Sequence, residues 1–196
     1  MGFRDTIFLQ TQPNFTTDEL KLIKSLYKRR TVKKNTLLVE SGQICRKLFL
    51  IKTGVIRFFF THHEKEFTWN LTTEGMFATV LSSFVNQIPS HDTLQTVSPS
   101  VVYEMSYEDN QKLINEMPNY ADMYRILLEK ALMEQGQRLR EQIAETGQER
   151  YEKLMNNRPE LFQIIPQGIL GSYLGMTRQS LSRLQKQAYL KNIGKL

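Results

Sequence analysis

Cysteine is nearly absent from this chain of 196 residues, because Cys45 is its only thiol. A single thiol cannot form an intramolecular disulfide, and it excludes a thiolate cluster drawn from this chain alone, which disfavours iron–sulfur sensing. The sequence also has no apolar run approaching the roughly 20 residues that span a bilayer, and no signal-peptide run at its start. We therefore expect a cytoplasmic protein without a membrane partner.

Signatures of catalysis are missing as well. No nucleophile motif, phosphate loop or paired-carboxylate constellation stands out, so we expect neither an enzyme nor a cofactor. His62 and His63 resemble metal ligands of a β-roll, but neighbours on a strand point to opposite faces, and both are expected in an exposed hairpin turn. No metal site is therefore predicted. Cys45 precedes two cations and is interpreted as an ordinary turn cysteine, with an oxidant-sensing thiol as the alternative.

Acidic residues are absent from residues 161–196, although the whole chain has 20 of them. Five of the six excess positive charges of the chain belong to this segment, and they are Arg178, Arg183, Lys186, Lys191 and Lys195. Neutralising phosphates with such a segment releases condensed counterions and gives affinity that does not depend on base sequence. The segment therefore predicts a polyanion partner.

Short apolar runs punctuated by glycine and proline fill residues 36–107 and predict an antiparallel β-roll, sandwich or barrel. The expected strands are residues 37–39, 48–51, 55–60, 66–71, 93–97 and 101–105. A helix capped by Thr16 or Thr17 is expected over residues 16–28. The basic residues 28–30 and 33–34 that follow it are interpreted as a solvated surface turn.

Helices are expected after residue 107, first over residues 109–115 and then from a cap at Asn119 to about residue 143. The apolar stripe of the second helix is longer than one small domain needs, which predicts that part of it packs against a second copy. The alternative is that the sheet domain covers the whole stripe. The predicted dimerisation residues are Tyr120, Met123, Tyr124, Leu127, Leu128, Ala131, Gln135 and Leu139.

Two short helices joined by a glycine-bearing turn are expected within the basic segment, over residues 166–174 and from Thr177 to about residue 189. A further helix, over residues 146–157, precedes them. The second helix of the pair carries small and bidentate side chains on its outer face, which suit base edges and phosphates in the major groove. The predicted DNA-binding residues are Thr177, Arg178, Gln179, Ser180, Ser182, Arg183 and Lys186.

Four segments in a fixed order carry a resemblance to a known family. They are KNTLLVESG at residues 34–42, LFLIKTG at 48–54, ERY at 149–151 and SYLGMTRQSLSR at 172–183. With them the chain resembles the cyclic-AMP receptor and Fnr (Crp/Fnr) family of transcription regulators. The resemblance implies an α+β fold with a cyclic-nucleotide-binding-like β-roll (double-stranded β-helix) over residues 1–118, a dimerisation helix over 119–145 and a helix-turn-helix DNA-binding domain over 146–196.

Two departures from that family bear on function. Members that bind cyclic nucleotides have a Gly-Glu pair for the ribose and an Arg-Ser or Arg-Thr pair for the phosphate, whereas this chain has FATVLSSF at residues 77–84 and PSHDT at 89–93. Without a fixed cation, and with Asp92 nearby, cyclic AMP is not expected to be the effector. The second departure is the ten residues after Lys186, which are too few for the complete β-wing.

Aromatic residues of the roll favour an apolar small-molecule effector or none, and the residues expected to bind it are Phe77, Leu81, Phe84, Ser90, His91 and Thr93. Three classes of function remain open. The first is a homodimeric regulator that binds an inverted-repeat operator in double-stranded DNA, with RNA polymerase as a further candidate partner. It explains the basic segment and the long apolar stripe together. A ligand-binding or protein-interaction module that no longer binds DNA explains the short end, and a cupin-like metalloenzyme explains only the roll.

Overall fold

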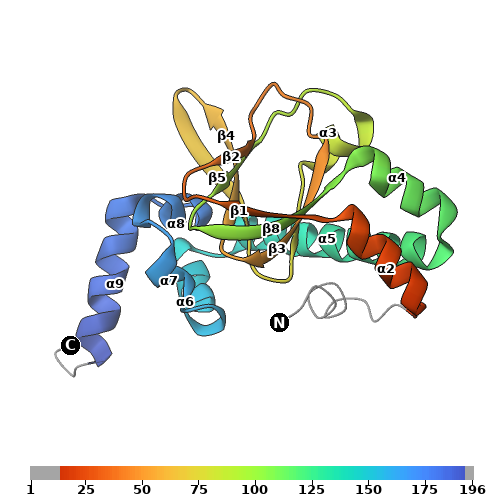
Figure 1. The fold of residues 1–196 in the computed structure, drawn as a ribbon. Helices are drawn as coiled ribbons and strands as arrows, with labels where there is room; N and C mark the ends of the chain where they lie inside the picture. Colours follow the sequence, from red (N-terminus) through yellow and green to blue (C-terminus); the bar gives the residue numbers. More distant parts are fainter. Residues whose placement is uncertain (1–13, 193–196) are drawn as a thin grey trace.

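Two four-stranded antiparallel sheets form the centre of the protein (Figure 1). The computed structural model describes residues 14–192. Strand order is β1-β8-β3-β6 in one sheet and β2-β7-β4-β5 in the other. The strands are β1 (Lys28–Val32), β2 (Leu37–Val39), β3 (Lys47–Thr53), β4 (Ile56–His62), β5 (Lys65–Thr72), β6 (Phe77–Ala78), β7 (Thr93–Thr96) and β8 (Ser100–Ser106).

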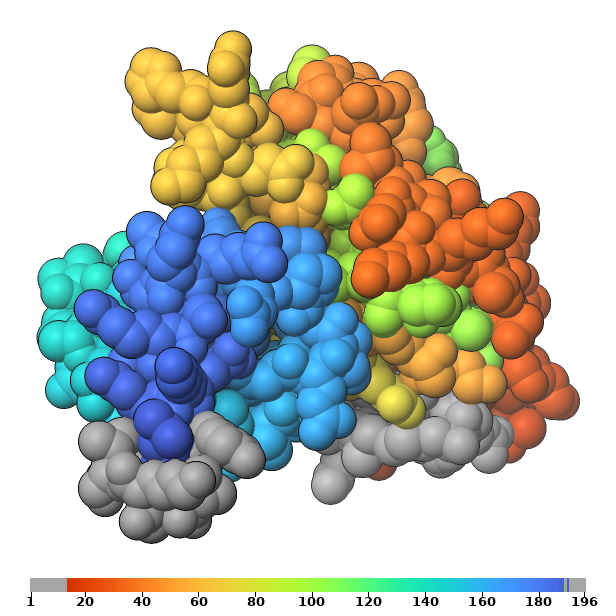
Figure 2. All heavy atoms as spheres, turned by 90° about the vertical axis from the view of Figure 1, so that its left-hand side faces the viewer, coloured from red at the N-terminus to blue at the C-terminus, as the bar shows by residue number. Residues whose placement is uncertain are grey.

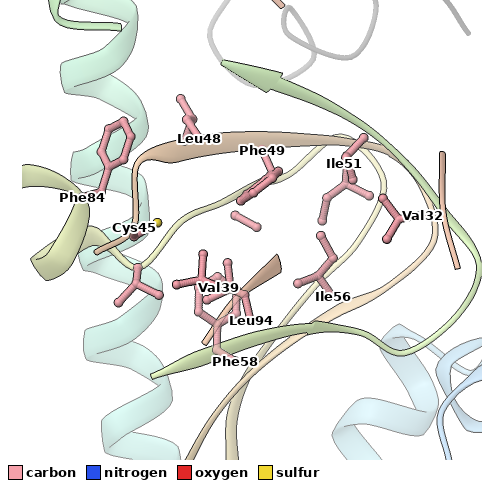
Figure 3. Packing of buried hydrophobic residues seen from close by; sticks show 13 residues of the cluster. Val32, Val39, Cys45, Leu48, Phe49, Ile51, Ile56, Phe58, Phe84 and Leu94 are labelled. Carbon is pink, nitrogen blue, oxygen red and sulfur yellow. The ribbon is translucent and has the colours of Figure 1, made fainter. Parts of the chain in front are cut away.

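The hydrophobic core lies between the two sheets, where side chains from their inner faces meet (Figure 3). Phe49 and Ile51 come from β3, Ile56 and Phe58 from β4, and Leu94 from β7, and all are buried. Alternation along each strand places these residues on one face, as antiparallel pairing requires. The strand pattern leaves a roll, a sandwich or a barrel open, and the observed fold is the β-roll that the family resemblance implies.

Glycines occupy the sharp reversals between the strands. Gly42, Gly54 and Gly75 all have positive φ, at 89°, 102° and 81°. At Gly54 a β-carbon would lie 2.2 Å from the Ser100 hydroxyl oxygen, so no other residue fits there without a shift of β8. Between β4 and β5 the turn residues are His63 and Glu64, whose φ values of 46° and 59° give the tight hairpin turn that the sequence predicts.

The basic residues after the first helix are only partly the surface turn that was expected: residues 28–30 belong to a strand, whereas Lys33 and Lys34 lie exposed at the turn that follows it. Lys28, Arg29 and Arg30 belong to β1, which pairs with β8 in regular antiparallel register. Their side chains are exposed because β1 is an edge strand, and lysine or arginine on an edge discourages pairing with other chains. The exposed charges therefore prevent this strand from being recognised in the sequence, although its backbone pairs regularly in the sheet.

Helices flank the roll at both ends and along one side (Figure 1). α2 and α4 lie at one end, the long α5 runs past the sheets, and α6 to α9 gather at the other end. Two short elements that the sequence pattern does not predict, β6 and α3, lie between β5 and β7. The helices are α2 (Thr17–Leu26), α3 (Leu81–Asn86), α4 (Tyr107–Glu116), α5 (Pro118–Ala144), α6 (Gly147–Asn157), α7 (Leu161–Ile164), α8 (Gln167–Tyr173) and α9 (Arg178–Asn192).

A threonine or serine side chain caps α2, α4, α6 and α9, whereas α3, α5, α7 and α8 begin without a side-chain cap. Thr16 caps α2 in a capping box with Glu19, and Thr146 caps α6 in the same way. The predicted cap at Asn119 is wrong, because α5 begins at Pro118, whose fixed φ suits the first helical position. The Asn119 amide instead donates to the carbonyl oxygen of residue 14 at 3.2 Å.

The far end of the chain is helical where it is described. α9 continues to Asn192, so the residues that follow Lys186 up to that point extend the helix. Lys195 and residues 1–13, which belong to predicted segments, lie outside the described residues, as do the side chains of Tyr189 and Lys191. Within residues 14–192 no helix combines the length and apolarity that crossing a bilayer requires.

Candidate nucleic-acid interface and apolar cavity

The α8–α9 unit, residues 167–192, is a pair of helices joined by a turn of the predicted kind. Gly175 in the turn has φ of 69°, a conformation that favours glycine. Thr177 begins the second helix, and its side-chain oxygen accepts the Ser180 backbone N–H at 3.1 Å. Leu170 and Leu181 are buried between the helices. These contacts fix the angle at which α9 leaves the turn.

Close packing at Gly171 brings the start of α9 against α8. A β-carbon at Gly171 would lie 3.2 Å from the Met176 carbonyl oxygen and 3.4 Å from the Thr177 carbonyl carbon. Both neighbours are backbone atoms, so they yield less readily than a flexible side chain. A side chain at this position would therefore require the backbone at the start of α9 to shift by a few tenths of an ångström.

The α8–α9 unit is docked on the end of the roll. Ser172 of α8 accepts the Thr68 backbone N–H of β5 at 2.9 Å. Val55, Leu71 and Val97 of the roll belong to the same buried cluster as the apolar residues of α7, α8 and α9. Residues of the segment 146–196, to which the family resemblance assigns a DNA-binding domain, thus share a hydrophobic core with the sheets.

The outer face of α9 is open to solvent (Figure 2, blue). Five of the seven predicted DNA-binding residues line one groove of about 520 Å³ beside this helix, together with Gln167 of α8. Within the described part of the chain no carboxylate forms an ion pair with the cations among them. The five residues are Arg178, Gln179, Ser182, Arg183 and Lys186.

The other two predicted DNA-binding residues have a different place. Thr177 is exposed but is engaged as the cap of α9. Ser180 is half-buried, and its hydroxyl oxygen accepts the Thr177 hydroxyl at 3.0 Å. Both hydroxyl groups therefore serve the start of the helix, which leaves the five groove residues as the accessible polar face.

Two arginines outside the predicted site hold the α8–α9 unit in place. Arg138 of α5 donates from Nε to the Trp69 carbonyl oxygen and from Nη2 to the Tyr173 carbonyl oxygen, both at 2.7 Å. Arg150 of α6 donates from Nε to the Leu174 carbonyl oxygen at 2.9 Å. The last carbonyl groups of a helix lack partners within it, so these cations satisfy the end of α8. Backbone acceptors have no signature in the sequence, and only Arg150 falls in a segment that carries the family resemblance.

A cavity of about 190 Å³ lies between the roll and α5. Its walls carry no charged side chain, and their polar groups are those of Asn70, Thr79, Gln135 and the tyrosines. The volume is below the roughly 300–1,000 Å³ of pockets for drug-sized ligands. The lining residues are Leu48, Phe58, Trp69, Asn70, Phe77, Thr79, Leu81, Tyr120, Met123, Tyr124, Leu127, Leu128, Ala131 and Gln135.

Two of the six residues expected to bind an effector, Phe77 and Leu81, line this cavity. The other four have roles elsewhere. Phe84 is in the roll core, the Ser90 hydroxyl donates to the Asp92 carbonyl oxygen, His91 is exposed, and Thr93 accepts a backbone N–H from residue 41. These four do not line the cavity because α3 and the loop before β7 turn their side chains into the core or out to solvent.

Asp92 lies beside the cavity rather than in its lining. Its carboxylate accepts the Trp69 Nε1–H at 2.8 Å, and the Trp69 ring packs at 5.3 Å from that of Phe58. Burial raises the pKa of Asp92, and the hydrogen bond from Trp69 opposes that shift. The carboxylate therefore fixes the orientation of an indole that forms part of the cavity wall.

The predicted dimerisation stripe divides into two parts. Tyr120 and Met123 are 1% and 2% exposed within the chain itself, so the expectation that they contact a second copy is corrected. Leu139 remains 62% exposed, and Leu132 and Ile143 near it are 75% and 78% exposed. The first half of α5 faces the cavity of its own roll, with all the predicted residues from Tyr120 to Gln135 in its lining, and the second half has an uncovered apolar face.

The histidines and the cysteine have no ligand geometry in the described structure. His62 ends β4 and His63 begins the exposed hairpin turn, with their rings 4.1 Å apart. Among residues 14–192 no group of three His, Cys, Asp or Glu side chains is arranged to hold a metal ion. Cys45 is buried, and its sulfur lies 3.3 Å from the Thr79 hydroxyl oxygen.

Comparison with known proteins places the chain among others of this architecture. Residues 29–117 match the family model of the cyclic nucleotide-binding domain. A search of curated protein sequences finds no match. Solved structures match over most of the chain, at identities that show the fold alone.

Three of those structures illustrate the likeness. The catabolite activator protein of Thermus thermophilus is 21% identical, with 96% of this chain and 88% of that chain covered and a TM-score of 0.57. The c-di-GMP-responsive regulator CLP of Xanthomonas campestris is 16% identical, with coverage of 88% and 91% and a TM-score of 0.69. A protein from Eubacterium rectale, described as a Crp/Fnr-family transcriptional regulator, is 17% identical, with coverage of 92% and 86% and a TM-score of 0.70. Residues 29–117 are thus similar to cyclic nucleotide-binding domains, and the chain as a whole shares its fold with these three proteins, one of which is described as a member of the Crp/Fnr family.

Proposed function

We propose that this protein is a homodimeric transcription regulator that acts in the cytoplasm, is not an enzyme, and reads DNA with α9. The observation that carries the proposal is the exposed, unpaired cationic face of α9 in a fold shared with Crp/Fnr regulators. The α8–α9 unit serves as its helix-turn-helix. Positive charge at the start of α9 adds to the attraction for phosphates, because the helix dipole has its positive end there.

Each groove residue has a role that follows from its chemistry. Arg178 and Arg183 have planar forks that match the paired acceptors of guanine, and Gln179 can pair with adenine. Ser182 is a secondary base contact, and Lys186 meets a phosphate. In a dimer the two copies of α9 enter successive major grooves about one helical turn apart, so the operator is an inverted repeat.

DNA-binding measurements on two variants, each of which loses one positive charge, test the proposed role of Arg183. Genomic fragments bound by the full-length protein define the operator, and its affinity is then measured for Arg183→Ala and for Lys24→Ala. Lys24 is an exposed lysine of α2, at the opposite end of the molecule from α9 (Figure 1). Arg183→Ala should weaken operator binding by about 1–3 kcal/mol if the arginine reads a base, while Lys24→Ala leaves it unchanged. Equal affinities for the two variants remove the assignment of Arg183.

The second half of α5 supports the dimer in this proposal. Leu132, Leu139 and Ile143 are spaced seven and four residues apart and share one face, which suits packing of two helices along a seam. Leu139→Glu should convert the dimer to monomer in sedimentation experiments. Gln137→Glu adds the same charge on the opposite face of α5 and should leave the dimer intact. Dimerisation of the Leu139 variant would contradict this role of α5.

An effector of this regulator is uncharged and largely apolar. The uncharged lining of the 190 Å³ cavity supports that choice, because a cyclic phosphate buried there would lack a cationic partner. N-phenyl-1-naphthylamine, a neutral apolar fluorophore, should increase its emission on binding. Cyclic AMP should not displace it, and displacement at comparable concentrations would contradict the proposed ligand class.

A further inference from the structure

Arg138 contacts the roll and the α8–α9 unit at the same time. Its two hydrogen bonds end on a β5 carbonyl group, that of Trp69, and on the last residue of α8, Tyr173. Its guanidinium carbon also lies 3.7 Å from the centre of the Tyr173 ring, a stacking distance. Burial lowers the pKa of this guanidinium, and the nearby charge of Glu141 opposes that shift only in part.

Trp69 connects this contact to the apolar cavity. The indole ring lines the cavity, whereas the carbonyl oxygen of the same residue accepts from Arg138. On the facing wall, Gln135 lies one turn before Arg138 on α5 and also lines the cavity. Both walls of the cavity are therefore linked to Arg138, one through the Trp69 carbonyl group and the other through α5.

We propose that Arg138 is the positioning residue through which occupancy of the apolar cavity sets the orientation of the α8–α9 unit. An occupant that displaces the Trp69 indole moves the adjoining carbonyl group of β5. Because the guanidinium is a rigid planar fork, its hydrogen bond to Tyr173 changes with it. The regulatory meaning of this relay rests on the proposed function, since a change at α8 alters how α9 meets DNA.

Variants of Arg138 are expected to fold, because other contacts hold α8 in place. Ser172 accepts a backbone N–H from β5, and Arg150 holds the Leu174 carbonyl group independently. The variant Arg138→Gln removes the fork, and Arg138→Lys keeps the charge without it. Arg140→Gln is the matched control, since Arg140 is an exposed residue of the same helix and loses the same charge.

Hydrogen exchange in the full-length dimer, with and without N-phenyl-1-naphthylamine, tests the relay. Probe binding is followed by its own emission and by Trp69, the only tryptophan of the chain. In the unmodified protein and in Arg140→Gln the probe should change the exchange rate of peptides from α8. In Arg138→Gln and Arg138→Lys those peptides should exchange about tenfold faster without probe, and their rates should no longer respond to it, although the probe still binds.

Three results would overturn the relay. They are failure of the unmodified protein to bind the probe, an α8 exchange rate that ignores the probe in the unmodified protein, and equal responses in Arg138→Gln and Arg140→Gln. None of these measurements uses DNA. If duplex DNA does not bind but α8 responds through Arg138, the proposed function fails and the relay stands; if DNA binds and the Arg138 variants respond normally, the relay alone fails.

Discussion

Gly175→Ala is the substitution that tests how the α8–α9 turn is built. Gly175 has φ of 69°, a conformation that alanine adopts only with strain. An added β-carbon would also lie 2.9 Å from the Gln142 amide oxygen and 3.1 Å from Arg150 Nη2. The substitution therefore perturbs both the backbone of the turn and the arginine that holds the Leu174 carbonyl group.

Most of the expected loss of stability comes from the backbone conformation at residue 175. A left-handed conformation costs a residue with a β-carbon about 1–2 kcal/mol. The contacts with Gln142 and Arg150 add less, because both atoms are at the far ends of flexible side chains that can move by a few tenths of an ångström. We expect Gly175→Ala to lower the free energy of unfolding by about 1–2 kcal/mol in total.

Urea unfolding followed by circular dichroism measures this difference, and Gly168→Ala is its control. Gly168 is an exposed residue of α8 with no atom near its would-be β-carbon, so alanine there should stabilise the protein by up to about 1 kcal/mol. The two glycine-to-alanine changes thus have opposite predicted signs within one short motif. A neutral or stabilising effect of Gly175→Ala would refute the argument from the turn conformation.

Three further predictions concern stability. Leu170→Ala should destabilise the protein by about 2–5 kcal/mol in urea unfolding, because this fully buried leucine fills the core shared by α8, α9 and the roll. Tyr120→Phe should cost about 1–3 kcal/mol, since the lost hydroxyl donates at 2.8 Å to a buried oxygen of Asn110; no change would mean that another donor replaces it. Hydrogen bonds from Thr146 lower the pKa of Glu149 in the folded protein below its ordinary value of 4.5. As pH falls, Glu149 therefore binds a proton in the unfolded chain before it does so in the folded protein. The stability that the ionised Glu149 contributes is thus lost as pH falls below 4.5 toward the lower pKa of the folded state. Glu149→Gln should make the acid-induced loss of stability shallower, and an identical pH profile would contradict the capping-box argument.

The parts of the fold that depend on local rules were predictable from the sequence. Residues 37–39 coincide with β2, and Thr16 and Thr177 cap the helices as expected. β1 was missed because exposed cations on an edge strand have no apolar alternation to reveal it. At α5, Pro118 determines the helix start through its fixed φ, so the capping preference of Asn119 does not decide it.

The candidate site divides in the same way. Arg178, Arg183 and Lys186 were predicted because a polar helix face follows from spacing along one element. Of the residues that line the cavity, only Phe77 and Leu81 were predicted to bind an effector. Most of the other lining residues belong to α5, and the apolar pattern of a helix is the same whether it packs on its own roll or on a second copy. Arg138 could not be predicted, since its partners are backbone carbonyl groups that every residue has.

If the cationic face of α9 binds duplex DNA, the affinity must fall as salt concentration rises, because neutralised phosphates release their counterions. Affinity for an operator duplex is measured at several salt concentrations for the unmodified protein and for Lys186→Ala. Binding should weaken with salt, and the slope of log affinity against log salt concentration should be smaller by about 2 in the variant, because each protomer of a dimer loses one phosphate contact. Absence of duplex binding at low salt, or the same slope for both proteins, would contradict DNA binding by this face of α9.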